Sequence, residues 1–280
     1  MSDFRAHIEL ARPLNCLIAA ASILLGAFIT GDIDSPWPIF LACLSGMLIA
    51  AGGNAINDYY DAGIDRINRP LRPIPSGKVS RIQALMMSMV LLAIGTVLGW
   101  ALGWKTGLIA SGSAMTLILY SMYLKSRTLV GNMSVGFIAS LAFIYGGLAY
   151  DRFHETLIPA WFAFLFHLGR EIIKDVEDMA GDQAGNVRTL PIQYGKRMAL
   201  ATASLVFILL IISTLLPFFL NIYGAVYLWV VILGVDCLLL YVIFSMWRDP
   251  QPARLGHLSF LLKVDMLVGL LAIYLGSQFH

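Results

Sequence analysis

The chain has 280 residues, of which 59% are hydrophobic and only 13% are charged. A soluble domain of this size does not need so much apolar surface, so the composition indicates a multi-pass membrane protein. The formal net charge of +2 gives no sign of a nucleic-acid partner, and none is expected. The three cysteines lie singly in apolar segments, without disulfide or metal-ligand spacing, and we interpret them as core residues.

Nine apolar runs are long enough to cross a bilayer as helices. In chain order, we expect these spans at about 14–31, 38–57, 82–103, 106–124, 130–150, 157–175, 198–219, 222–246 and 258–277. The prediction is therefore an all-helical bundle with a central cavity, in one domain over residues 1–280. Related motifs in the second and sixth spans favour two tandem four-helix halves with a ninth helix appended.

The basic residues predict the orientation of this bundle in the cell membrane. If the N-terminus is cytoplasmic, only Lys105 and Arg152 of the 19 lysines and arginines lie on the outer side. Such an asymmetry is the positive-inside signal of membrane proteins. We therefore expect the N-terminus to be cytoplasmic. We expect the same of the two acidic motifs, which are described in the next paragraph.

Acidic motifs end the second and sixth spans. The first places Asp58, Asp61 and Asp65 after Asn57, and the second repeats the carboxylate spacing; its members are Asp175, Asp178 and Asp182. At about 100° per residue, each triad falls on one face of a helix. Carboxylates crowded in this way repel one another unless cations neutralise them. Because Mg²⁺ prefers oxygen ligands and shares them with phosphates, the pattern predicts a magnesium and diphosphate site.

Basic and hydroxyl side chains close to these motifs are candidates for contacts with phosphate. The loops at about 66–81 and 183–197 are the longest and most basic connections on the predicted cytoplasmic side. Anchoring at the membrane interface is an alternative explanation for each basic residue. The candidate phosphate contacts are Arg69, Arg72, Tyr120, Lys125, Arg127, Lys174 and Arg188. Lys174 stands at the position equivalent to Asn57, and we expect it to pair with a carboxylate or with phosphate.

These motifs resemble those of the UbiA superfamily of intramembrane prenyltransferases. The first family signature, Asn-Asp-x-x-Asp-x-x-x-Asp, is matched at 57–65, and the second, Asp-x-x-x-Asp, is matched at 178–182. The resemblance implies a cavity open to lipid, an Mg²⁺ cofactor and an isoprenyl diphosphate substrate. It implies catalytic roles for Asp61, Asp65, Asp178 and Asp182. Asn57, Asp61, Asp178 and Asp182 carry over as metal ligands, and Asp58, Asp65 and Asp175 carry over as ligands or as groups that support them.

Two longer strings, RPLRPIPSG at 69–77 and REIIKDVEDMAGD at 170–182, resemble the branch of digeranylgeranylglyceryl phosphate synthases. That resemblance implies transfer from geranylgeranyl diphosphate to the sn-2 hydroxyl of geranylgeranylglyceryl phosphate, a lipid-like acceptor that carries a phosphate. Arg12 and Asn15 are then candidate acceptor contacts.

Other functions stay open at this point. The first string also occurs in the chlorophyll synthase branch, and an aromatic or quinone-precursor acceptor is a further alternative. A transporter or cation-binding protein is the non-enzyme alternative, but its acids would lie near the midplane of the bilayer rather than near one face. The oligomeric state and the length of the prenyl chain are not predicted.

Overall fold

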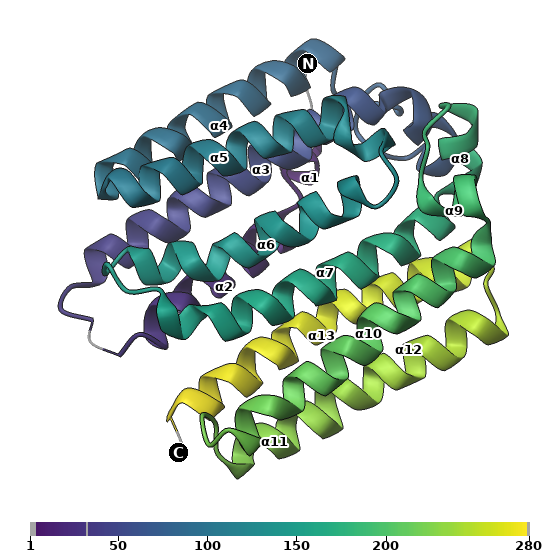
Figure 1. Ribbon diagram of the computed structural model, residues 1–280. Helices are drawn as coiled ribbons and strands as arrows, with labels where there is room; N and C mark the ends of the chain where they lie inside the picture. Colours follow the sequence, from purple (N-terminus) through teal and green to yellow (C-terminus); the bar gives the residue numbers. More distant parts are fainter. Residues whose placement is uncertain (1–3, 32, 279–280) are drawn as a thin grey trace.

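A computed structural model describes residues 4–31 and 33–278, and every regular element in these ranges is helical (Figure 1). The elements are α1 (Phe4–Ala11), α2 (Pro13–Phe28), α3 (Pro36–Asn68), α4 (Arg81–Leu102), α5 (Trp104–Met122), the 3-10 turn η1 (Leu124–Ser126), α6 (Val130–Leu148), the 3-10 turn η2 (His154–Thr156), α7 (Leu157–Glu177), α8 (Met179–Ala184), α9 (Leu190–Tyr194), α10 (Lys196–Phe219), α11 (Ala225–Val230), the π-helical turn η3 (Val231–Asp236), α12 (Cys237–Arg248) and α13 (Pro252–Gln278).

Seven segments of the described chain are long and apolar enough to cross a membrane: α3, α4, α6, α7 with η2, α10, α11 to α12, and α13. The pair α1 and α2 passes the same test as one bent segment, which gives up to eight spans. α5 lies where the span 106–124 is predicted, but it is not among these candidates. The protein is thus an all-helical, multi-pass membrane protein.

The bend of 44° between α1 and α2 has a local cause at Arg12. This residue adopts a left-handed backbone conformation, with a φ of +52°, and it is followed by Pro13 at the start of α2. Proline lacks a backbone N–H and disfavours helical backbone at the residue before it, so α1 cannot continue through this point. The bend brings the Arg12 side chain to α3, where it reaches Asp58.

α3 carries the first acidic motif and is longer than a bilayer requires. Its 33 residues span about 50 Å at the rise of an α-helix, whereas the hydrocarbon core of a bilayer is about 30 Å thick. The helix begins at Pro36, with the Ser35 side chain as its N-cap, and ends at Asn68. The helix is therefore long enough for part of it to extend beyond the hydrocarbon, and its last turns carry Asp58, Asp61 and Asp65.

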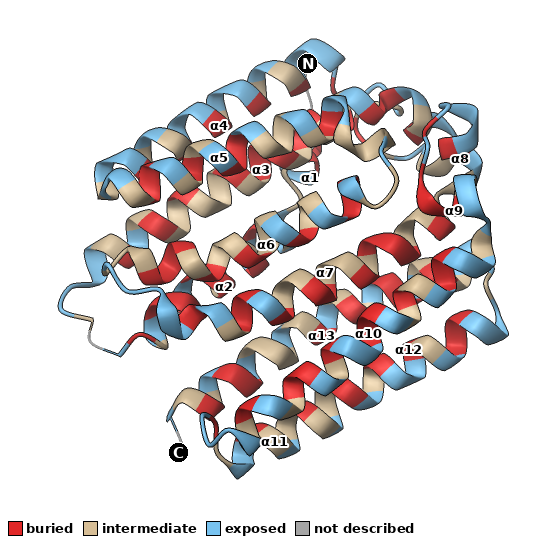
Figure 2. Ribbon diagram, viewed as in Figure 1, coloured by how far each residue is buried: buried red, intermediate tan, exposed pale blue. Residues whose placement is uncertain are grey.

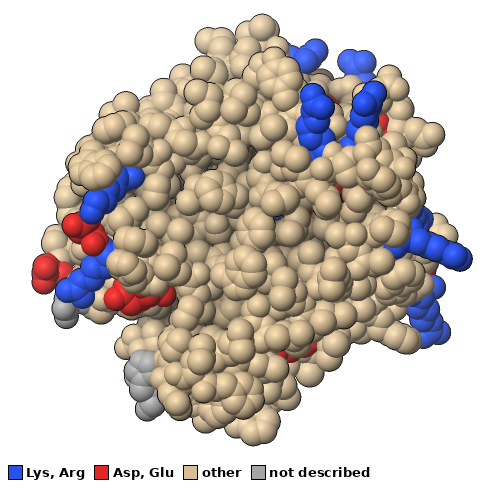
Figure 3. Space-filling model, in the orientation of Figure 1, with Lys and Arg blue, Asp and Glu red and all other residues tan. Residues whose placement is uncertain are grey.

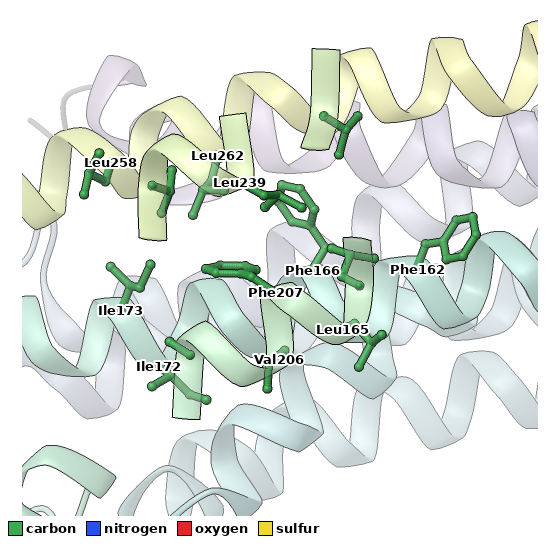
Figure 4. Close-up of a cluster of buried hydrophobic side chains, with 14 of the residues drawn as sticks. Phe162, Leu165, Phe166, Ile172, Ile173, Val206, Phe207, Leu239, Leu258 and Leu262 are labelled. Carbon is green, nitrogen blue, oxygen red and sulfur yellow. The ribbon is translucent and has the colours of Figure 1, made fainter. Parts of the chain in front are cut away.

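The helices pack through two main apolar clusters. The larger one lies mostly between α7, α10, α12 and α13, where Phe166, Phe207 and Leu239 point toward one another (Figure 4). The backbones of α2 and α6 are in close contact at Gly146. A Cβ added to this glycine would lie only 1.9 Å from the carbonyl oxygen of Ile23. Small residues allow such backbone contacts in membrane helices.

The outer surface has the character expected of a protein in lipid. Buried residues face the interior of the bundle, and exposed residues line its outside (Figure 2). Large apolar side chains such as Val97, Leu205 and Phe244 are at least 65% exposed. Lysines and arginines gather at the end of the bundle that carries α8, and the middle of the face in Figure 3 shows almost no charged side chains.

Candidate active site

The first acidic motif lies on the inner face of α3, as its spacing predicts. Asp58, Asp61 and Asp65 are only 3%, 5% and 4% exposed. Tyr60 and Arg66, which point the other way, are exposed. Three carboxylates are therefore held inside the protein on one side of one helix, where they need neutralising partners.

Cations from separate segments supply these partners. The Nζ atom of Lys125, in η1, donates to Asp61 at 2.5 Å. Arg72 donates to Asp65 at 2.6 Å and to Asp58 at 3.4 Å. Arg12 also donates to Asp58. Each carboxylate of the first motif thus has a cation as its partner, and each cation is one that the sequence analysis selected for a substrate contact.

The second acidic motif does not lie on one helix, which corrects the expectation of a single helical face. α7 ends at Glu177, Asp178 lies at the junction, and Asp182 belongs to the short helix α8. Asp175, in the last turns of α7, accepts a hydrogen bond at 2.8 Å from Asn132 of α6. Asp182 is 2% exposed. The break turns the chain so that these carboxylates come from two helices.

Asn68, the last residue of α3, joins the two motifs. Its side-chain Nδ2 donates to the Asp178 carbonyl oxygen at 2.9 Å, and its Oδ1 accepts from the Gly181 N–H at 2.9 Å. The next residue, Arg69, donates to Glu177 at 3.0 Å and to Asp178 at 3.2 Å. The end of α3 and the junction of α7 and α8 are therefore in direct contact, at the end of the bundle seen beside α8 in Figure 1.

Lys125 lies within electrostatic range of both motifs. Burial on its own would lower the pKa of the Lys125 ammonium, but Asp61, Asp182 and Asp178 together raise it above its ordinary value. Burial raises the pKa of Asp182 to about 6; Lys125 opposes this shift, while Asp178 and Asp61 add to it. Lys125 thus contacts Asp61 and is within electrostatic range of carboxylates of the second motif.

A cavity of about 480 Å³ opens beside the motifs. Near the acidic end it is lined by polar groups, and farther along α2, α3 and α5 by apolar ones such as Ile23, Ile49 and Ile109. The predicted site residues that line it are Arg12, Asn15, Asn57, Arg69, Arg72, Tyr120 and Lys174. Arg127 and Arg188 are exposed and are not among its lining residues, so their contact with phosphate stays a prediction.

Several polar residues that the sequence analysis did not select belong to this region. They are Asn68, Asn132, Arg170, Glu171 and Lys263. Lys174 pairs with a carboxylate, as predicted, but the partner is Glu171, at 2.8 Å, and not a residue of the motifs. The signal that would have found Arg170, Glu171 and Lys263 is their charge, because ionisable groups within membrane spans are rare and usually functional.

The oxygen atoms of the two acidic motifs can be compared with the ligands that a metal ion requires. Within the described residues, no group of three or more His, Cys, Asp or Glu side chains is arranged to hold a metal by itself. Mg²⁺, however, is usually held by one or two carboxylates together with water and substrate phosphate oxygens. The motifs offer carboxylate and amide oxygens, with neither thiolate nor imidazole among them. These residues therefore fit Mg²⁺ when a phosphate ligand completes the coordination.

Comparison with known proteins agrees with this arrangement. Residues 19–264 match the UbiA prenyltransferase family. The digeranylgeranylglyceryl phosphate synthase of Methanothermobacter thermautotrophicus is 35% identical over 271 residues, which cover 97% of this chain and 95% of that protein. A solved structure of digeranylgeranylglyceryl phosphate synthase is 33% identical and matches with a TM-score of 0.76 over 99% of both chains.

The same fold occurs in a more distant relative. A UbiA homologue from Archaeoglobus fulgidus, solved with GPP and Mg²⁺ bound, is 19% identical and has a TM-score of 0.72 over 96% of this chain and 99% of that one. At that identity the likeness concerns the fold alone. Because the family model matches most of the chain and a relative is 35% identical over nearly its full length, the chain belongs to the UbiA prenyltransferase family.

Proposed function

We propose that this prenyltransferase moves the geranylgeranyl group of geranylgeranyl diphosphate to the sn-2 hydroxyl of geranylgeranylglyceryl phosphate in an Mg²⁺-dependent reaction that forms an ether-lipid precursor. Family membership and the full-length relatives named for this synthesis support the reaction. The observation that carries the proposal is structural. Two acidic motifs are joined through Asn68, and Asn57 of the first motif and Arg69 and Arg72, which pair with motif carboxylates, line a cavity whose far walls are apolar.

The described chain has seven or eight candidate spans, one or two fewer than the nine expected from the sequence. We propose that α5 is the ninth span, because its 19 residues pack against α3, α4 and α6, which are candidate spans themselves. The bundle then has two four-helix halves plus α13, in one domain over residues 1–280. The bias of Lys and Arg toward the end that carries α8 supports a cytoplasmic N-terminus and a cytoplasmic site.

The acidic motifs are proposed to hold Mg²⁺. The proposed ligands are Asn57, Asp58, Asp61, Asp65, Asp175, Asp178 and Asp182. When bound, Mg²⁺ would neutralise the negative charge that develops on the departing diphosphate. Lys125 pairs with Asp61, and Arg72 pairs with Asp65. We propose that these cations transfer to substrate phosphate oxygens, which offer charge-assisted bonds of the same kind.

The remaining residues position the substrates. Arg69, Arg72, Tyr120 and Lys125 are proposed to contact the diphosphate of the donor, and Lys174 is proposed to contact a substrate phosphate. Arg12 and Asn15 line the same cavity from the start of α2 and are proposed to contact the acceptor. The apolar far walls hold the prenyl chain, because each CH₂ group removed from water contributes about 0.8 kcal/mol. They also exclude water from the allylic carbon, which would otherwise be hydrolysed.

The proposed bond changes are balanced within the two substrates. The bond between C1 of the prenyl chain and the diphosphate oxygen breaks, and its electron pair leaves with the diphosphate. The sn-2 hydroxyl oxygen bonds to C1. Its proton passes to a carboxylate of the acidic motifs, of which Asp61, Asp65, Asp178 and Asp182 are the proposed catalytic members, or to the released diphosphate.

Product analysis tests this proposal. The purified protein is incubated with geranylgeranyl diphosphate, Mg²⁺ and either geranylgeranylglyceryl phosphate or a hydroxybenzoate, and the products are identified by mass spectrometry. The proposal predicts the doubly prenylated glyceryl phosphate and no prenylated ring. A prenylated hydroxybenzoate, or no transfer to either acceptor, would contradict it.

A further inference from the structure

The cavity carries more positive charge than the acidic motifs neutralise. Six basic residues line it, and Glu171 is the one carboxylate among its lining residues. Three of the six, Arg12, Arg69 and Arg72, pair with the acidic motifs. The other three, Arg170, Lys174 and Lys263, come from α7 and α13 and contact neither motif.

Glu171 is shared by two of these three cations. It accepts from Arg170 at 3.0 Å and from Lys174 at 2.8 Å. Lys263 makes no hydrogen bond or ion pair within the described part of the chain, although it is half-buried at the cavity wall. Glu171 is thus the one carboxylate that forms ion pairs with this group of cations within the described residues. Glu177 is within electrostatic range of Arg170 and Lys174, but its own ion pair is with Arg69.

The three cations are held close to one another by contacts between α7 and α13. The Nε atom of Arg170 donates to the Ser259 carbonyl oxygen at 3.2 Å. Ser259 precedes Lys263 by four residues, so both lie on the same face of α13. Arg170 is therefore beside the turn that carries Lys263. Lys263 is also within electrostatic range of Arg12 and Lys174.

Grouping like charges in a partly buried wall is unfavourable unless an anion compensates them. The reaction proposed above, on which this inference rests, has two anionic substrates. The donor diphosphate is assigned to the acidic motifs with Mg²⁺ and the cations paired there. Of the two acceptor contacts proposed above, Asn15 is uncharged and Arg12 already pairs with Asp58, so the acceptor phosphate still needs a cationic partner. We propose that Lys263, Arg170 and Lys174 form a separate site that binds the phosphate monoester of the glycerol-lipid acceptor.

Glu171 is a positioning residue in this site, because it holds both Arg170 and Lys174 without contacting the substrate phosphate. Arg12 lies between the two anion sites, since it pairs with Asp58 and is within electrostatic range of Lys263. The two substrates would then lie in one cavity with their anionic groups at different walls. This arrangement makes the acceptor phosphate a determinant of specificity, as a phosphate-free alcohol cannot use the three cations.

Steady-state kinetics with Lys263→Gln test the site. With geranylgeranyl diphosphate saturating, we expect the KM for geranylgeranylglyceryl phosphate to rise by about tenfold or more, the effect of losing one hydrogen bond to a charged group. The KM for the donor should not change. With geranylgeranylglycerol, which lacks the phosphate, the variant and the wild type should be equally active. Lys263→Arg should restore most of the affinity for the phosphate-bearing acceptor.

The matched control is Lys105→Gln, which removes the same charge from an ion pair with Asp151, outside the cavity. It should leave both KM values unchanged. Size-exclusion profiles and melting temperatures identify any variant that does not fold. If Lys263→Gln does not fold, Arg170→Gln, which removes another cation of the same site, carries the test by the same comparison of the two KM values. An unchanged acceptor KM in Lys263→Gln, or an equal rise in the donor KM, would overturn the site. Wild-type protein that cannot prenylate geranylgeranylglyceryl phosphate would instead overturn the proposed function.

Discussion

Asp61→Asn is the sharpest test of the proposed metal site, because it removes a charge and preserves the size of the side chain. Asp236→Asn is its matched control. Asp61 and Asp236 are 5% and 4% exposed, so the two substitutions affect equally buried carboxylates. Asp61 pairs with Lys125 beside the second motif, whereas Asp236 accepts from the Thr214 hydroxyl at 3.1 Å in the second half of the chain.

The expected magnitudes follow from these contacts. Asp61 is proposed to hold the Mg²⁺ that would neutralise charge on the leaving diphosphate, so its loss should lower kcat by about 10²-fold to 10³-fold, or about 3–4 kcal/mol. Breaking a fully buried ion pair costs about 3–5 kcal/mol of stability. Lys125 is 23% exposed and remains partly solvated when its partner is lost. We therefore expect a smaller loss of stability in Asp61→Asn, about 1–3 kcal/mol.

The assay compares kcat at saturating substrates with the melting temperature of each variant in the same detergent. Asp61→Asn should be folded at the assay temperature and nearly inactive, and Asp236→Asn should be active. A folded Asp61→Asn variant with the kcat of the wild type would refute the assignment of Asp61 to the metal site. Equal loss of activity in a folded Asp236→Asn variant would show that burial of a carboxylate, and not its place in the motif, determines the effect.

Three further predictions concern the metal and the packing. EDTA should abolish turnover and added Mg²⁺ should restore it; full turnover in EDTA would exclude an essential divalent ion. Asn68→Ala removes two hydrogen bonds between α3 and the junction at Asp178. We therefore expect a loss of about 1–3 kcal/mol of stability and a lower kcat. An unchanged melting temperature would contradict this role of Asn68. Gly146→Ala places a Cβ 1.9 Å from the Ile23 carbonyl oxygen and should lower the melting temperature strongly. Gly112→Ala, whose Cβ meets nothing within 4 Å, is the control and should not.

The membrane class and the first acidic motif could be predicted because both depend on local pattern. The length of an apolar run can be read from the sequence and compared with the thickness of a bilayer. The i, i+3, i+7 spacing of Asp58, Asp61 and Asp65 places them on one face of any helix. The structure agrees, with all three aspartates buried and Tyr60 exposed. The predicted span 106–124 corresponds to α5, which is not among the candidate spans because its glycine, serine and threonine residues make it less apolar.

The break after Glu177 could not be predicted from spacing, since the periodic pattern continues through it. The break is accompanied by hydrogen bonds from Asn68, which is 110 positions from Asp178 in the sequence. Local periodicity carries no information about such a distant partner. For Arg170, Glu171 and Lys263 the sequence does hold a signal, their charge within apolar spans, but only the packing of α7 against α13 shows that they meet.

The sequence alone determined that the chain crosses a membrane repeatedly, that it carries two acidic motifs, and that it resembles a prenyltransferase family. Those features belong to single helices, and they follow from residue type and helical period. Only the tertiary structure decided which cation neutralises each carboxylate, that Asn68 joins the two motifs, and that Arg170 and Lys263 meet at one cavity wall. These pairings depend on how α3, α7 and α13 pack, and packing is set by contacts spread over the whole chain.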